Sequence, residues 1–409
     1  MAGAAPLAYG IFSGGKYIMI PLMKNTFLNE YETKKELVDF ILKAKILSMG
    51  EKCAEFEKAF AKAQGRKYCV LFNSGGSANL ALLQALKNLG RLKDGDTVGF
   101  SALTWSTNVM PILQLGMKAV PVDCEAQTLN CMAANLSQTL KKVKLNAFFI
   151  TNALGFAGDL GEIRDVCKKN GVLLIEDNCE SLCTALPEGK TGNFGLASTF
   201  SFFVAHHMST IEGGCACTDD DEMDEMMRIT RANGWDRNLN FTAQRRLRAK
   251  HGIKSEFEAK YTFYDLGFNL RPTEITGFLG LTQLKYLDEN CAIRQKNYLA
   301  LEEEAKNNPD LLPIKRGHLS FLSNFAFPVI CKTKELRGKY IEQFSGDGVE
   351  IRPVIAGNMQ HQPFFAKYVK GDWDLKGAQF LHECGFYFGN YPELTGSDLD
   401  MLKSCLRKY

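Results

Sequence analysis

Small residues that follow a predicted strand form the first candidate site. The apolar run 68–72 precedes a stretch that includes Gly75, Gly76 and Ser77, and helical residues 78–86 come directly after it. Free backbone N–H groups, hydroxyl groups and the positive end of a helix together bind phosphate. A glycine-serine turn followed by a helix N-cap explains the same residues equally well. The segment therefore predicts either a phosphate site or an ordinary turn.

Two adjacent acids end another predicted strand. The apolar run 172–175 is followed by Glu176 and Asp177. Because neighbouring side chains of a strand point in opposite directions, at most one of the two faces a site at the carboxyl end. A carboxylate there can keep a pyridine nitrogen protonated, as in enzymes that use pyridoxal phosphate. Alternatively, Asp177 is the N-cap of a following helix.

Trp105 follows a third strand-like run, 97–100. Its indole can stack flat on an aromatic ring, although a tryptophan in the protein core is the more common situation. Ligands of parallel α/β sheets bind outside the carboxyl ends of the strands. The glycine-rich turn, Trp105 and the acid are therefore expected at one edge of a sheet, where together they favour a site for an aromatic phosphate.

The most informative segment is 198–214, in which a Ser-Phe strand with Ser201 is followed by His206, His207 and a glycine-rich turn. It resembles the fold-type I sugar aminotransferases of the DegT/DnrJ/EryC1/StrS family, which carry a lysine that forms a Schiff base with pyridoxal phosphate. In that frame His206 occupies the lysine position. Without the family frame, a solvated or capping histidine pair would be the simpler interpretation.

No lysine lies between Lys190 and Lys250, so no neighbouring residue supplies the missing amine. The exchange of lysine for histidine resembles the sugar 3-dehydratases of the same family, which use pyridoxamine phosphate and a histidine base. One group of these enzymes also holds a [2Fe-2S] cluster on a Cys-x-Cys and a cysteine further downstream. Here Cys215 and Cys217 lie too early, and no cysteine occurs between Cys217 and Cys291. We therefore expect no iron–sulfur cluster and no metal site.

The chain is more similar to the cluster-free group, which acts on GDP-4-keto-6-deoxy-D-mannose in the colitose pathway. The similarity extends from about Ile20 to the C-terminus. It rests on residues 48–51, 122–123, 128–130, 176–181, 206–207, 212–215, 267–272, 352–354 and 357–358. Several of these segments also occur in aminotransferases, and the Glu-Asp-Asn-Cys-Glu-Ser sequence and the histidine pair are the more specific ones.

This resemblance implies a role for each candidate residue. The cofactor phosphate would be held by Gly75, Gly76, Ser77 and Ser201. Trp105 would cover the cofactor ring, Asp177 would pair with its nitrogen, and Glu180 would orient cofactor or substrate. Asn269 would reach the cofactor of the neighbouring subunit, so the active unit would be a homodimer. The sequence Gly-Ser-Ala at 76–78 stands where the relative has Ser-Thr-Ala, which puts one hydroxyl contact to the phosphate in question.

The reaction that the resemblance implies begins with L-glutamate, which converts pyridoxal phosphate into pyridoxamine phosphate. The amine then condenses with the C4 ketone of a GDP-linked 4-keto-6-deoxysugar. His206 would act as base and acid while the C3 hydroxyl departs, because imidazole titrates near neutral pH. Two alternatives stay open: a nucleotide-sugar 4-aminotransferase that works without its lysine, and a catalytically silent subunit that binds the cofactor.

A basic stretch follows these segments. It is either a solvated face or a surface for the substrate diphosphate, and Arg237 is its one candidate binding residue. Its members are Arg231, Arg237, Arg245, Arg246, Arg248 and Lys250. His207 is predicted to have a structural role.

The order of the predicted elements indicates an α/β protein. From residue 68 onward, short strand-like runs alternate with helical stretches, which predicts a mainly parallel sheet and agrees with the aspartate-aminotransferase-like fold of the family. Helices at 30–47 and 53–63 precede this sheet. Strand-like runs at 321–329 and 349–354 predict a smaller α+β unit. The expected division is an extension at 1–17, a large domain at 18–285 and a C-terminal domain at 286–409.

Composition excludes several classes of protein. The 409 residues suffice for two or three domains. A balance of 49 Lys+Arg against 46 Asp+Glu does not indicate a nucleic-acid-binding protein. The 13 scattered cysteines without repeated CxxC pairs fit a reducing compartment. The uncharged stretch 191–211 is too polar for a membrane helix, and the first residues lack the pattern of a secretory signal. A cytoplasmic location is therefore expected.

Overall fold

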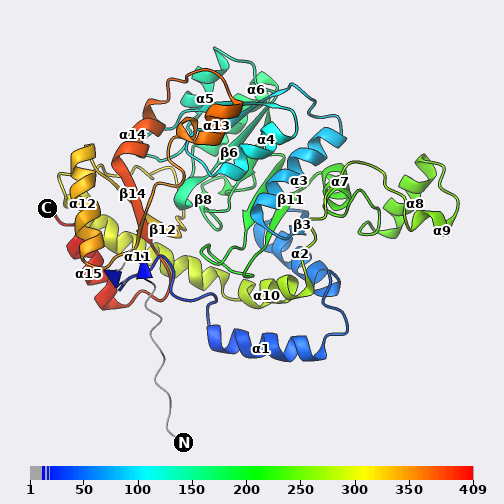
Figure 1. Cartoon of the computed structure of the whole chain (residues 1–409), viewed down its shortest axis with the longest axis horizontal. Coiled ribbons are helices and arrows are strands. Elements are labelled where there is room, and N and C mark those ends of the chain that lie inside the picture. The colour runs from blue at the N-terminus through cyan, green and yellow to red at the C-terminus, as the bar shows by residue number, and fades with distance from the viewer. Residues whose placement is uncertain (1–11, 14–15, 18, 409) are drawn as a thin grey trace, which may run out of the picture.

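The structure, a computed structural model, describes residues 12–13, 16–17 and 19–408 (Figure 1). The extension predicted at 1–17 lies mostly outside the described residues. Within it, β1 (Phe12–Ser13) and β2 (Lys16–Tyr17) pair antiparallel. Two helices follow, α1 (Glu30–Lys43) and α2 (Glu51–Gln64). The Glu274 carboxylate accepts hydrogen bonds from the backbone N–H groups of Gly50, Lys52 and Cys53, which fixes the start of α2.

A seven-stranded sheet forms the centre of the molecule, and the predicted α/β fold class is confirmed. The strands lie in the order β3-β11-β10-β7-β6-β4-β5, and β11 runs antiparallel to both of its neighbours. Their bounds are β3 (Tyr68–Phe72), β4 (Thr97–Ser101), β5 (Lys118–Val122), β6 (Ala147–Thr151), β7 (Leu173–Asp177), β10 (Ala197–Ser201) and β11 (Gly214–Thr218). Four of these strands, β3, β4, β7 and β10, correspond to the strand-like runs near whose ends the sequence predicts a site.

Helices cover both faces of this sheet (Figure 1). Alternate strand residues belong to different apolar clusters, as the pleat requires. Phe149 and Ile175 pack with α3 (Gly75–Asn88) and α7 (Asp221–Arg231), whereas Phe148 and Leu174 pack with α5 (Ala133–Leu140) and α6 (Leu160–Asn170). The other elements between β3 and α7 are η1 (Ser106–Asn108), α4 (Met110–Gln114), η2 (Ala153–Gly155), β8 (Ala185–Leu186) and β9 (Gly189–Lys190).

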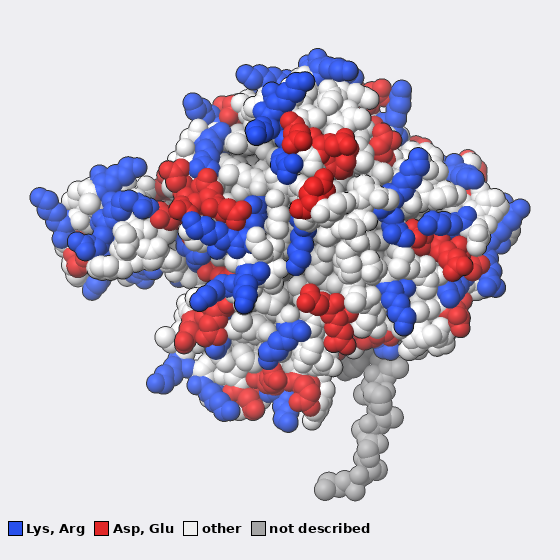
Figure 2. Space-filling view, turned by 180° about the vertical axis from the view of Figure 1, so that it is seen from behind, with Lys and Arg blue, Asp and Glu red and all other residues white. Residues whose placement is uncertain are grey.

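A segment with α8 (Phe241–Lys250) and α9 (Glu256–Ala259) projects from the body of the protein, at the right of Figure 1. Seen from behind, Lys and Arg side chains gather on this projection, whereas charges of both signs are mixed elsewhere on that face (Figure 2). The projection also carries exposed aromatic side chains, among them Phe241 and Phe257. We call residues 235–265 the projecting segment.

The C-terminal third forms a second, smaller sheet in the order β12-β14-β13. The predicted run at 321–329 yields a strand that starts only at Ala326, and β14, in the Gly-Phe-Tyr-Phe-Gly sequence 385–389, was not predicted. The bounds are α10 (Glu274–Leu284), α11 (Leu287–Asn307), β12 (Ala326–Ile330), α12 (Lys334–Gly346), β13 (Ile351–Pro353), η3 (Met359–His361), α13 (Pro363–Tyr368), α14 (Lys376–Cys384), β14 (Gly385–Gly389) and α15 (Gly396–Leu406). The domain division at residue 285 stays a prediction.

Across the described residues, no helix is long and apolar enough to cross a membrane.

Candidate active site

Asp177 is the last residue of β7 and is almost fully buried. Its Oδ2 accepts hydrogen bonds from the side-chain amides of Asn79 (2.9 Å) and Asn108 (2.7 Å), and its Oδ1 accepts one from the backbone N–H of Cys179 (2.9 Å). Thr199 in turn donates to Asn79 Oδ1 and fixes that amide. Three donors stabilise the ionised carboxylate and still leave it room to accept one more hydrogen bond.

Glu176, the preceding residue, points the other way. Its carboxylate accepts hydrogen bonds from the backbone N–H groups of Gly192, Phe194 and Gly195, at 2.7–2.8 Å. Burial raises the pKa of this carboxyl, and the three N–H groups act against that rise. The two adjacent carboxylates therefore point in opposite directions, as the alternation of a strand predicts. That Asp177 is the acid that faces the site stays a prediction. Glu176 holds a loop instead.

The first turn of α3 packs tightly against the end of β10. A Cβ atom added to Gly75 would lie 2.7 Å from Cβ of Ser201 and 3.1 Å from Sγ of Cys179, so only glycine fits there. Ser74, the N-cap, accepts a hydrogen bond from the backbone N–H of Ser77 at 3.0 Å and donates its hydroxyl group to that of Ser77, also at 3.0 Å. The backbone N–H groups of Gly75 and Gly76, earlier in the same turn, have no acceptor within the helix. This turn therefore offers donors and a positive helix end beside Ser201.

Trp105 lies between β4 and η1 and is 56% exposed. Its loop is fixed at two points. Asn108 donates to Asp177, and a Cβ atom added to Gly76 would lie 3.0 Å from the methyl group of Thr107. Trp105 is thus an exposed indole on a loop that contacts both Asp177 and the start of α3, rather than a core residue.

His206 lies in the loop after β10, near Ser201. Its ring is half-buried and makes edge contacts with Phe203 and Phe325, at centroid distances of 5.9 and 5.5 Å. Its Nδ1 is buried and has no hydrogen-bond partner within the described residues. Burial and, more weakly, the positive charge of Arg294 lower the pKa of His206 to about 4, while the charge of Asp177 acts in the opposite direction. The imidazole is therefore neutral at physiological pH.

His207 has a different environment. It is buried, and its Nε2 lies 3.0 Å from the backbone oxygen of Ser323. Its own backbone oxygen accepts from the side chain of Asn290 at 2.6 Å. Arg294, also on α11, donates to the carbonyl groups of Asn390 and, at 3.4 Å, of His206. These contacts support the predicted structural role of His207 and show that α11 fixes the backbone of both histidines.

Glu180 follows Asp177 by three residues and is half-buried. Its Oε2 accepts from the backbone N–H of Leu154 at 2.7 Å. Burial, assisted by the nearby charge of Asp177, raises the pKa of Glu180 to about 7. The chain reverses sharply at this contact, because Leu154 has φ 54° and Gly155 has φ 88°. Glu180 is therefore an acid that changes its charge near neutral pH beside Asp177.

Two predicted residues lie apart from this group. Asn269 and Arg237 line a separate pocket of about 410 Å³ together with Ser48, Trp235 and Arg271. The guanidinium of Arg237 stacks on Trp235, at 4.0 Å from the ring centroid, and Asn269 Oδ1 accepts from Arg271 at 3.0 Å. Both predicted residues are exposed. The sequence-predicted residues thus form two groups within one chain, one of mostly buried or half-buried residues at the strand ends and an exposed one at the base of the projecting segment.

The basic stretch splits in the same way, and its interpretation as one solvated face is wrong for Arg231. This side chain is buried and donates to the Glu57 carboxylate at 2.6 Å and to the carbonyl oxygen of Leu71 at 2.7 Å. Arg248 pairs with Asp236, and Arg246 pairs with Glu225. The helical pattern alone does not reveal which arginine meets an interior acid.

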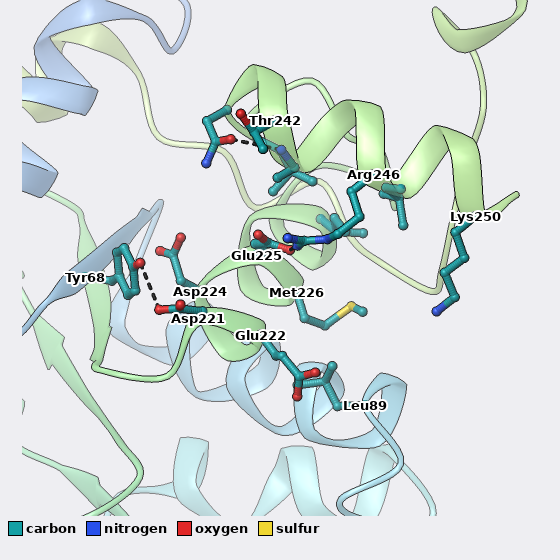
Figure 3. Close-up of a pocket in the computed structure, with 15 residues that line it drawn as sticks. Tyr68, Leu89, Asp221, Glu222, Asp224, Glu225, Met226, Thr242, Arg246 and Lys250 are labelled. Atoms are coloured by element: carbon teal, nitrogen blue, oxygen red, sulfur yellow. Dashed lines mark hydrogen bonds and ion pairs between the residues drawn. The ribbon is translucent and has the colours of Figure 1, made fainter. Parts of the chain in front are cut away.

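A further hollow, of about 670 Å³, lies between α7 and α8 (Figure 3). Acids of α7, such as Asp221 and Glu225, line one side, and Arg246 and Lys250 line the other. The Asp221 carboxylate accepts from Tyr68, and Arg246 binds Glu225. None of the sequence-predicted site residues lies in this hollow, in which Arg246 pairs with Glu225.

Sequence reasoning missed the residues that position the site. Asn79 and Asn108 fix Asp177, Asn290 and Arg294 fix the histidines, and Ser74 caps α3. The signal for Asn79 was available, because an asparagine inside a predicted apolar helix requires a buried partner. Arg294 lies far along the chain in a polar helix and had no such signal.

Comparison with known proteins gives a family and a set of similar structures. The model of the DegT/DnrJ/EryC1/StrS aminotransferase family matches residues 29–407. GDP-4-keto-6-deoxy-D-mannose 3-dehydratase of Escherichia coli O55:H7 is 32% identical over 398 residues, which are 95% of this chain and 100% of that protein. A crystal structure of GDP-4-keto-6-deoxymannose-3-dehydratase with trapped PLP-glutamate superposes with a TM-score of 0.87, at 32% identity over 95% of this chain and 100% of that one. The crystal structure of a histidine-to-asparagine variant of that enzyme with bound GDP-perosamine superposes with a TM-score of 0.85, at the same identity and coverage.

Proposed function

Because the chain belongs to the DegT/DnrJ/EryC1/StrS aminotransferase family, we propose that it is a pyridoxal-phosphate-dependent dehydratase. It removes the C3 hydroxyl group of a nucleotide-linked 4-keto-6-deoxyhexose. The single observation that carries the proposal is the neutral imidazole of His206 with its unpartnered Nδ1, at the place that the sequence resemblance assigns to the family's Schiff-base lysine. L-Glutamate is the amino donor, and GDP-4-keto-6-deoxymannose is the sugar substrate, as the names of the similar proteins suggest.

The residues at the strand ends fit pyridoxal phosphate. The first turn of α3 supports a phosphate site at Gly75, Gly76, Ser77 and Ser201, because glycine brings the backbone within contact of Ser201. Asp177 keeps one acceptor position open beyond its three donors. Trp105 offers an exposed aromatic face on the loop that contacts both. Phosphate, pyridine nitrogen and ring each have a matching group.

When bound, the cofactor supplies an amino group and an electron sink. Asp177 then holds the proton of the pyridine nitrogen, because its buried negative charge favours the protonated ring. Asn79 and Asn108 prevent the carboxylate from turning away. Ser201 and the first turn of α3 would hold the phosphate group of the cofactor.

His206 moves the protons. Its pKa of about 4 keeps the imidazole neutral near pH 7. Its buried Nδ1 has no hydrogen-bond partner among the described residues. A neutral imidazole with a free nitrogen accepts a proton and then delivers it to the departing C3 hydroxyl group. A histidine, unlike a lysine, leaves the amino form of the cofactor free to act on the sugar ketone. This difference separates dehydration from amino transfer.

The exposed pocket with Asn269 and Arg237 supports a homodimer in which Asn269 reaches the cofactor of the neighbouring subunit. Polar and cationic groups at this pocket have few partners of their own chain. Helix α1 supports the same association. It packs on α10 through Phe40 and Phe278, whose rings stack at 4.4 Å, while Tyr31 and Leu42 are 78% and 79% exposed. Arg237 then lies where it can bind the substrate diphosphate.

We place the enzyme in the cytoplasm. All 13 cysteines are free thiols in the structure, which supports a reducing compartment.

Size-exclusion chromatography with light scattering tests the dimer, and the Asn269→Ala variant should stay dimeric while it retains the cofactor less well on dilution.

The decisive experiment is the mass of the sugar product after incubation with pyridoxal phosphate, L-glutamate and GDP-4-keto-6-deoxymannose. Loss of one oxygen from the sugar, with release of ammonia, is expected. Replacement of the ketone by an amine would instead identify an aminotransferase. Binding of cofactor without any change of the sugar or of glutamate would identify a catalytically silent subunit.

A further inference from the structure

Three cysteines meet inside the central sheet, on strands that are far apart in the sequence. Cys215 and Cys217 share one face of β11, because side chains two residues apart in a strand point the same way. Cys69 lies directly opposite Cys217 on β3. The three sulfur atoms lie within 4.8 Å of one another, and each residue is at most 2% exposed. We call Cys69, Cys215 and Cys217 the sulfur cluster.

The surroundings of the sulfur cluster are apolar. It belongs to the core formed with Phe56 and Phe60 of α2 and with Phe200 of β10. Within the described part of the chain, no histidine, aspartate or glutamate joins this group of possible ligand atoms. The cluster therefore offers three sulfur ligands without a nitrogen or oxygen ligand and without room for bulk water.

The three thiols are not equivalent. Burial by itself raises the pKa of all three. At Cys217, hydrogen bonds from Cys215 and Cys69 and the positive charge of Arg66 outweigh burial, and they lower the pKa of the Cys217 thiol. Arg66 is itself held nearby by Asp219 and by the carbonyl groups of Gly192 and Gly195.

We propose that Cys69, Cys215 and Cys217 bind one monovalent soft metal ion, Cu(I), through their three sulfur atoms. Thiolates select soft ions such as Cu(I), whereas Mg²⁺ and Ca²⁺ require oxygen ligands. Structural Zn²⁺ sites use four ligands, and iron–sulfur clusters are held by four residues. The cluster offers three sulfur ligands and, among the described residues, no fourth ligand, so it matches neither of these four-ligand sites and fits a soft ion such as Cu(I).

The cluster departs from the sequence-based expectation of no metal site. That expectation considered only Cys215 and Cys217, because Cys69 is distant in the sequence. Copper at this position links β3, which lies at the edge of the sheet, to β11. The same two strands lead to Gly214 and to the start of α3, since Gly214 pairs with Phe72. The ion would stabilise the ladder that positions this turn, whether or not the proposed reaction takes place.

The test is an anaerobic titration of the reduced full-length protein with Cu(I) bound to bicinchoninate, a coloured chelator. We expect the protein to withdraw one Cu(I) per chain, and X-ray absorption should show a shell of sulfur atoms only. The variants Cys217→Ala and Cys69→Val should lose this binding. Two matched control variants should still bind copper. Cys131→Ala replaces a fully buried cysteine in a different apolar core, and Cys183→Ala removes a thiol close to Cys291.

Further outcomes keep the proposal falsifiable. Copper should raise the melting temperature Tm of the parent protein and of both controls, because a ligand of the folded state stabilises it. Since the cluster is buried, the titration is repeated with copper present during refolding from urea. Failure to withdraw copper in both formats, nitrogen or oxygen ligands in the absorption spectrum, or full binding by a folded Cys217→Ala variant would overturn the proposal. Displacement by equimolar Zn²⁺ would overturn the assignment to a monovalent ion. If Cys217→Ala does not fold, the absorption spectrum of the parent protein decides.

Discussion

The strand ends around Asp177 and the projecting segment carry polar side chains of similar kinds in opposite environments. At the strand ends, the two adjacent carboxylates are buried and have specific partners: Asp177 accepts three hydrogen bonds, and Glu176 accepts three others. In the projecting segment, Arg237 lies exposed on the face of Trp235, and among the described residues it donates only to the carbonyl oxygen of Lys260.

This difference separates chemistry from recognition. A buried group changes its protonation because water no longer stabilises its charge, as the low pKa of His206 and the high pKa of Glu180 illustrate. An exposed cation keeps its charge and its freedom to meet a partner. On the proposed function, the first region would determine which protons move, and the second would determine which molecule binds. Exchanging residues in each region tests this division.

The largest effect is expected for His206→Asn. Removal of the proton carrier should lower the rate of sugar dehydration by about 10²–10⁴-fold, whereas the glutamate half-reaction, which is followed by the absorbance of the cofactor, should continue at a measurable rate. The reaction is assayed by the mass of the product. His207→Asn is the matched control. Its main effect should be on Tm, since His207 contacts the Ser323 carbonyl rather than the site. Equal loss of dehydration in both variants would contradict the distinction between the two histidines.

The second prediction compares two arginines of the basic stretch. Arg231→Met leaves the Glu57 carboxylate with fewer partners in the core and should lower the free energy of unfolding by about 3–5 kcal/mol. Arg237→Met should change it by less than about 0.5 kcal/mol. Urea denaturation of the two variants provides both values. A similar loss for both would show that the projecting segment is part of the cooperative fold rather than a binding surface.

The sequence predicted the position of the strand ends well, and the reason is physical. A short apolar run bounded by small or polar residues is typical of a strand that is buried on both faces of a sheet. Residues soon after such a run lie near the carboxyl end of the strand. Gly75, Trp105 and Asp177 were found in this way, whereas Ser201 was assigned from the family resemblance.

The partners of these residues were not predictable in the same way. Arg231 and Arg237 look alike in the sequence, and only the tertiary position of Glu57, on a helix distant in sequence, buries the first. The sulfur cluster and the support of His206 by Arg294 arise from pairings across more than 80 residues. Local periodicity contains no information on such pairings, and β14 was missed because it begins and ends with glycine, which is depleted in strands.

The third prediction concerns the two adjacent acids. Asp177→Asn retains the shape of the side chain but removes the charge that Asn79 and Asn108 stabilise, so the pyridine nitrogen loses its counter-charge. The glutamate half-reaction should slow by about 100-fold, in the range seen when one preorganised electrostatic group is removed. Stopped-flow absorbance of the cofactor measures it. The control Glu176→Gln should lower Tm and leave the half-reaction of the folded protein unchanged. An unaffected half-reaction in Asp177→Asn would remove this residue from the cofactor site.

The smallest effect is a pH dependence of stability due to Glu180. The pKa of its carboxyl is about 7 in the folded protein, above the usual value of about 4.3 in an unfolded chain. Between these values the folded state binds the proton more tightly, so stability falls as the pH rises from about 4 to 7. Because the side chain is only half-buried, we expect about 1–2 kcal/mol of this loss to come from Glu180.

The measurement is urea unfolding of the cofactor-free protein at pH 5 and pH 8. Glu180→Gln should reduce the difference between the two values by that amount, whereas the exposed control Glu188→Gln should not. If Glu180→Gln left the difference unchanged, Glu180 would be charged throughout, and the contrast between buried groups that change protonation and exposed groups that do not would rest on His206 alone.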